Sequence, residues 1–191
     1  MAGFYKIRGL AIREIDMPIG ELFALMHDLK VAKPSDLVGV PLAEVRNMER
    51  FFAVKFPAVY VQFLHRCGRS AGFLAGWWSI YFDDLKEVAS DFEQISATRA
   101  PATALPKGGV FIANQGLVFD YLLCNGEPDP AVWRVDFSHS VLVCEEYASS
   151  YTEYLESFIR SATARAVSLD DMIDTEVDSW SLDGFEIELS R

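Results

Sequence analysis

The sequence is poor in cysteine, and its three cysteines show no arrangement typical of a disulfide framework or a metal site. Cys67, Cys124 and Cys144 are odd in number, lie inside apolar segments and lack the short spacings of metal ligands. Free cysteine in such a segment behaves as a small hydrophobic residue. We therefore expect the protein to reside in a reducing compartment, the cytoplasm.

Histidine is equally scarce. His27, His65 and His139 are the three histidines, and none stands beside a cysteine or a carboxylate pair at metal spacing. His65 and Cys67 are two residues apart on different faces of a predicted helix, so they do not pair as base and nucleophile. The sequence predicts no metal site.

A long hydrophobic run is also missing. The longest charge-free apolar segment, residues 70–82, is too short to cross a bilayer as a helix. Lys6 and Arg8 lie near the N-terminus, but no apolar stretch follows them, so we expect no secretory signal.

Basic residues are few relative to acidic ones: the chain has 17 Lys and Arg and 28 Asp and Glu. Residues 1–68 hold nine basic and seven acidic residues, whereas residues 69–191 hold eight and twenty-one. Such a charge repels nucleic acid and anionic membranes and attracts basic partners. The alternative explanation is that the acidic surface serves only solubility.

Apolar residues, by contrast, make up 51% of the chain, enough for a sizeable core. They fall at helical spacing in several segments, and proline or a capping-box pair marks the start of each. One of these helices is expected to end at Gly68 in the left-handed conformation. The predicted helices begin at Pro18, Pro41, Pro57, Asp84 and Ser150. A further short helix is predicted around Leu169, Met172 and Ile173.

Strands are predicted mainly in the second half of the chain, where β-branched and aromatic residues are separated by turn residues. In the first of these strands the adjacent Trp77 and Trp78 would face opposite sides. This order of elements predicts a single-domain α+β protein with a mostly antiparallel sheet flanked by helices. The predicted strands are residues 77–82, 110–113, 117–124, 132–137, 141–144 and 185–189.

One motif could carry catalysis. Residues 68–72 match the Gly-x-Ser-x-Gly pattern, and Ser70 is followed by Asp120 or Asp136 and then His139, the order of an α/β-hydrolase. A predicted helix precedes the serine, however, where the nucleophile elbow requires a strand. A flexible loop at a helix exit is the better interpretation, and a small serine hydrolase using Ser70 is the remote alternative.

Paired acids are explained most simply by helix capping. Asp83-Asp84 and Glu145-Glu146 are each predicted near a helix start, where a carboxylate favours the positive end of the helix dipole.

The order of several motifs carries a resemblance to a known family. An acid precedes an aromatic pair, a proline opens an aromatic helix that a glycine closes, and a Trp-containing strand precedes a helix with a capping box. In this sequence these are Glu49 with Phe51-Phe52, Pro57 to Gly68, Val132-Trp133-Arg134-Val135-Asp136, and Ser150 to Phe158. Together they resemble the SUKH superfamily, which contains fungal Smi/Knr-type cell-wall regulators and many bacterial immunity proteins.

The resemblance implies a SUKH-like domain over residues 1–167, with its core at about 41–159. Residues 168–191 are expected to form an acidic appendage, which has no clear counterpart in the family. The resemblance also implies a protein-binding module with no enzymatic activity and no cofactor. An immunity protein would bind a cognate toxin, expected to be a basic nuclease-type domain; a regulatory or scaffolding protein is the alternative. The oligomeric state is left open. The residues expected to bind the partner are Trp77, Trp78, Asp83, Asp84, Glu127, Asp129, Trp133, Glu145 and Glu146.

Overall fold

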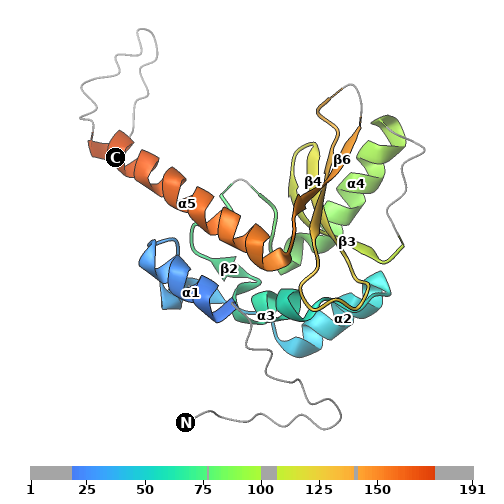
Figure 1. The fold of residues 1–191 in the computed structure, drawn as a ribbon, viewed down its shortest axis with the longest axis horizontal. Helices are drawn as coiled ribbons and strands as arrows, with labels where there is room; N and C mark the ends of the chain where they lie inside the picture. Colours follow the sequence, from blue (N-terminus) through green and yellow to red (C-terminus); the bar gives the residue numbers. More distant parts are fainter. Residues whose placement is uncertain (1–18, 77, 100–106, 140–141, 175–191) are drawn as a thin grey trace, which may run out of the picture.

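The computed structural model describes residues 19–76, 78–99, 107–139 and 142–174, with side chains through residue 163. Its elements confirm the predicted α+β class: five α-helices accompany one four-stranded and one two-stranded antiparallel sheet in this part of the chain. Figure 1 shows the four strands at the centre, with helices around them. The predicted strand at residues 185–189 lies outside the described residues.

The first three helices begin where proline predicts them. α1 (Ile19–Asp28) follows Pro18, and Pro41 and Pro57 are the N-caps of α2 (Leu42–Phe52) and α3 (Ala58–Cys67). The prediction for Gly68 was wrong in its conformation, because its φ is −65° and not left-handed. Glycine is required there for space, since a Cβ would lie 2.5 Å from the carbonyl oxygen of Leu64.

The prediction of a strand at residues 77–82 was wrong. Among residues 78–82, which the structure describes, only Ser79 bridges to the sheet. Its N–H donates to the Asn114 carbonyl at 2.9 Å, and its carbonyl accepts from the Asn114 N–H at 3.0 Å. The chain then turns into the 3₁₀-helix η2 (Phe82–Asp84), because the Asp84 carboxylate accepts the backbone N–H of Tyr81. α4 (Leu85–Arg99) follows directly.

The main sheet is a meander of four antiparallel strands in the order β3-β4-β5-β6. Its β3–β4 turn is Gly116-Leu117, and the predicted strand at 141–144 is instead β6, which extends to Ala148. A bulge between β5 and β6 leaves Tyr147 without a partner across the ladder. The strands are β3 (Gly109–Gln115), β4 (Val118–Leu123), β5 (Val132–Asp136) and β6 (Val143–Ala148).

A smaller sheet joins the first helices to each other. β1 (Leu37–Val38) follows the 3₁₀-helix η1 (Pro34–Asp36) and pairs with β2 (Ser70–Ala71), which follows α3.

Alternation along the strands divides the core between the two faces of the main sheet. Phe111, Phe119 and Tyr121 pack with Phe92 of α4 on one face. The opposite face belongs to a larger core that includes residues of α1, α2, α3 and α5 (Tyr151–Asp174). Figure 1 shows α4 in light green and α5 in orange on opposite sides of the strands.

The last helix begins with the predicted cap. Ser150 Oγ accepts the backbone N–H of Glu153 at 3.0 Å, while the Glu153 carboxylate accepts from the N–H of Ser149 at 2.9 Å. The predicted short helix around Leu169 is the continuation of α5, which runs to Asp174 and so passes the predicted domain boundary at residue 167. The division of the chain at residue 167 stays a prediction.

Candidate functional site

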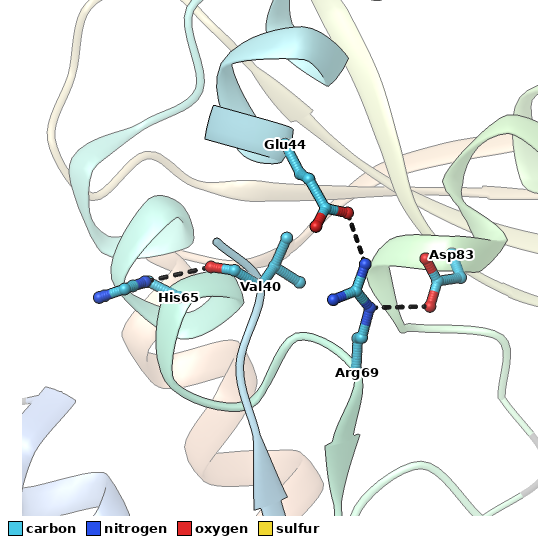
Figure 2. A network of polar contacts seen from close by, with 5 residues as sticks. All are labelled: Val40, Glu44, His65, Arg69 and Asp83. Carbon is cyan, nitrogen blue, oxygen red and sulfur yellow. Dashed lines mark hydrogen bonds and ion pairs between the residues drawn. The ribbon is translucent and has the colours of Figure 1, made fainter. Parts of the chain in front are cut away.

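One predicted site acid, Asp83, belongs to an ion-pair network that links three elements. Arg69, which precedes β2, lies between the two carboxylates: Nη2 is 2.5 Å from Glu44 Oε2 in α2, and Nε is 3.3 Å from Asp83 Oδ2 in η2. The hydrogen bond to Glu44 raises the pKa of Arg69, so the guanidinium stays charged. Figure 2 shows this arrangement beside a second contact, in which His65 Nδ1 lies 3.1 Å from the Val40 carbonyl oxygen.

Two further predicted acids accept backbone N–H groups. Asp84 accepts from Tyr81 at 3.2 Å, which holds the turn into α4. Asp129 accepts from Thr152 in the first turn of α5 at 3.1 Å, where a carboxylate also meets the positive end of the helix dipole. Both carboxylates therefore have a role within the fold.

The remaining three predicted acids are free. Glu127, in the β4–β5 loop, and Glu145 and Glu146, in β6, are exposed, and none of them forms an ion pair with a residue that the structure describes. The prediction that Glu145-Glu146 lies near a helix start was wrong, because both residues are inside β6. They stand opposite Arg134 and Trp133, so their side chains point to opposite faces of the sheet.

Trp78 and Trp133, two of the tryptophans expected to bind the partner, lie on opposite faces of the main sheet. Trp78 is half-buried, and its ring contacts that of Phe158 in α5 with 5.4 Å between centroids. Trp133 is also half-buried but packs against the core beneath α4, on the other face of the sheet. Trp77 lies outside the described residues.

The sequence analysis missed a buried polar cluster on the α5 face of the sheet. Asp120 in β4 is 0% exposed, and Arg134 in β5 forms two hydrogen bonds with it, at 2.7 and 2.9 Å. The Tyr154 hydroxyl donates to the same carboxylate at 2.9 Å. Trp78 and Tyr147 flank the guanidinium, whose carbon is 5.3 and 3.4 Å from their ring centroids.

Burial explains the electrostatics of this cluster. It raises the pKa of Tyr154 well above its ordinary value, and the negative charge of Asp120 raises it further. Tyr154 therefore stays protonated and acts as a donor. An acid between Phe119 and Tyr121, in a strand otherwise apolar, is the signal that could have revealed this cluster once the β4–β5 register had placed Arg134 opposite it.

The arrangement around the remote catalytic candidate is not that of a nucleophile elbow. Ser70 follows α3 and starts β2, and among the described residues no hydrogen bond joins its side chain to a histidine or a carboxylate. His139 instead pairs with Asp136, with 3.5 Å between Nε2 and Oδ2. The absence of enzymatic activity stays a prediction.

Two searches within the described residues gave negative results. No three or more His, Cys, Asp or Glu side chains gather in a way that could hold a metal ion. No helix in this part of the chain has the length and apolarity needed to cross a membrane.

The fold and its surface define a class of protein: an α+β domain in which some of the expected site acids make internal contacts and others are exposed. The family follows from a sequence match: residues 39–157 match the model of the SMI1 / KNR4 family (SUKH-1). The match covers more than half of the chain, so the chain belongs to this family, and the predicted SUKH membership is confirmed. Domains of this family are in general protein-interaction modules. A search of curated proteins gave no match.

Proposed function

We propose that this chain is a non-enzymatic immunity protein that binds and neutralises a cognate toxin with a basic surface. Family membership supports a protein partner. The observation that carries the choice of a basic partner is the exposure of Glu127, Glu145 and Glu146, which have no ion-pair partner among the described residues. Acids that are already hydrated and unpaired can steer a basic surface into contact without breaking an internal interaction.

Capture followed by a toxicity assay tests this proposal. The tagged full chain is incubated at low salt with lysate of its source organism, and bound proteins are identified by mass spectrometry. We expect one basic protein in near one-to-one amount whose expression alone is toxic and whose toxicity co-expression of this chain relieves. Many substoichiometric partners would favour the regulatory alternative.

A separate experiment tests the proposal that the chain is not an enzyme. The full chain is treated with a fluorophosphonate probe, with Ser70→Ala as the control. We expect equal, background labelling of both proteins, because Ser70 has no base within hydrogen-bonding contact among the described residues. Labelling that disappears in Ser70→Ala would overturn this part of the proposal.

A further inference from the structure

β6 is the outer strand of the main sheet. The order β3-β4-β5-β6 leaves its outer edge without a neighbouring strand in the part of the chain that the structure describes. At the opposite edge, Ser79 already bridges to β3. Four consecutive residues of β6, 144–147, are exposed. A row of backbone N–H and C=O groups at such an edge is a template for another strand.

The charge on this edge is negative and not neutralised by the sheet. Glu145 stands opposite Arg134 on β5, the cation that would be placed to pair with it. Arg134, however, directs its Nε and Nη2 to Asp120 in the core. Glu145 therefore keeps its charge free, and its neighbour Glu146 stands opposite the uncharged Trp133.

The negative charge of β6 decides which kind of strand can pair with its outer edge. Antiparallel pairing of β6 with β6 of a second copy would bring glutamates close to glutamates across the new ladder, which is unfavourable. Glutamates on an edge strand therefore oppose self-association. A strand with Lys or Arg facing the same positions gains attraction from both glutamates.

Tyr147 adds a fixed aromatic surface at the end of this edge. It is 42% exposed, yet its ring is held by Arg134 at 3.4 Å and by Tyr154 at 6.1 Å between ring centroids. An aromatic side chain that is already ordered loses little entropy when a partner covers it.

We propose that the outer edge of β6 binds an extended, basic segment of a partner protein as an additional strand. This inference rests on the proposed function in assuming a protein partner with a basic surface. It adds the secondary structure that the partner contributes and the edge that receives it.

A peptide titration tests the inference without the natural partner. The probe is a synthetic peptide of valine and lysine with two adjacent lysines, which point to opposite faces of the added strand as Glu145 and Glu146 do. Binding is followed by hydrogen exchange of the full chain. Two further peptides carry N-methyl groups on alternate residues, one on the odd positions and one on the even positions, so that each blocks one hydrogen-bonding edge. We expect added protection in residues 143–148, and at least tenfold weaker binding of one methylated peptide but not of the other.

Charge-reversal variants supply the matched control. Glu145→Lys/Glu146→Lys should weaken binding of the peptide at least tenfold. Glu87→Lys/Glu93→Lys, which reverses two exposed acids of α4, should bind it within about twofold because these acids do not lie on the strand that the peptide would extend. Equal weakening by both pairs, equal loss with both methylated peptides, or protection outside β6 would overturn the inference.

The two proposals can fail separately. Protection of β6 that rises with protein concentration in the absence of peptide would show that a second copy occupies the edge, and would overturn the inference. A toxin captured and neutralised equally well by Glu145→Lys/Glu146→Lys would leave the immunity function standing and remove β6 from it. Binding of the peptide at β6, with no toxin captured from the lysate, would leave the edge-strand inference standing and count against the immunity function.

Discussion

Asp120 is the residue whose environment differs most from that of an ordinary strand carboxylate. It is fully buried, and three hydrogen bonds from Arg134 and Tyr154 compensate for the loss of water. The Arg134 side chain is only 17% exposed, so little solvent could replace Asp120 as its partner. A buried pair of this kind adds little net stability by itself, but removing one member leaves the other uncompensated.

Asp120→Asn should therefore lower the free energy of unfolding by about 3 kcal/mol, as for other broken buried pairs. Urea denaturation measures the change. Glu156→Gln is the control, because the Glu156–Arg160 pair is exposed and spaced i,i+4, and its loss should cost less than about 0.5 kcal/mol. Similar costs for the two variants would mean that the Asp120 cluster is not a buried pair in solution.

At the scale of elements, close backbone contacts determine how the helices join the sheets. Gly39 follows β1 and passes the end of α3, where the Val40 N–H donates to the Leu64 carbonyl at 2.9 Å. A Cβ on Gly39 would lie 1.9 Å from the carbonyl oxygen of His65. The backbones of the two segments therefore approach more closely than any side chain allows.

Gly39→Ala should destabilise the protein by about 2 kcal/mol or more, because the chain must move away from α3 to admit the methyl group. Gly20→Ala in α1 is the matched control: nothing lies within 4 Å of its Cβ position. In a helix this change should be neutral or stabilise by up to about 1 kcal/mol. Thermal unfolding of both variants measures the difference, and a loss in Gly20→Ala as large as in Gly39→Ala would contradict the steric explanation.

At the scale of the whole molecule, the net charge of −11 matters through its distribution. Asp83, Asp84 and Asp129 make internal contacts, whereas Glu145 and Glu146 extend along an exposed edge. Charges in the second group act on an approaching partner without a cost to the fold. A partner that uses the first group would compete with these internal contacts.

Glu145→Gln/Glu146→Gln should therefore slow association with the captured basic partner about three- to tenfold at low salt, and the effect should shrink as salt is added. Stopped-flow kinetics measures the rate. The matched variant Glu87→Gln/Glu93→Gln makes the same change in net charge on α4 and should slow association less than twofold. An equal effect of the two variants would show that only the net charge counts.

Local sequence determined the elements that depend on local interactions. Proline fixed the starts of α2 and α3, Ser150 capped α5, and apolar periodicity identified the helices that pack on the sheet. The β-branched and aromatic residues of β3 to β5 and the turns between these segments also gave the antiparallel class of the sheet. The motif order gave the family. The caps, helices and turns were predictable because each depends on residues close together in the chain, and each motif used for the family is itself local.

Only the tertiary structure decided which charged side chains are held in internal contacts and which remain exposed to a partner. Asp129 meets Thr152 across 23 residues and Arg69 meets Glu44 across 25, so no local pattern reveals that these charges are occupied. Asp84 turns the chain into η2 where aromatic composition had favoured a strand. The register that commits Arg134 to Asp120 is also what leaves Glu145 unpaired at the edge of the sheet. Composition sets how many charges a chain carries, but long-range contacts decide which of them remain available to a partner.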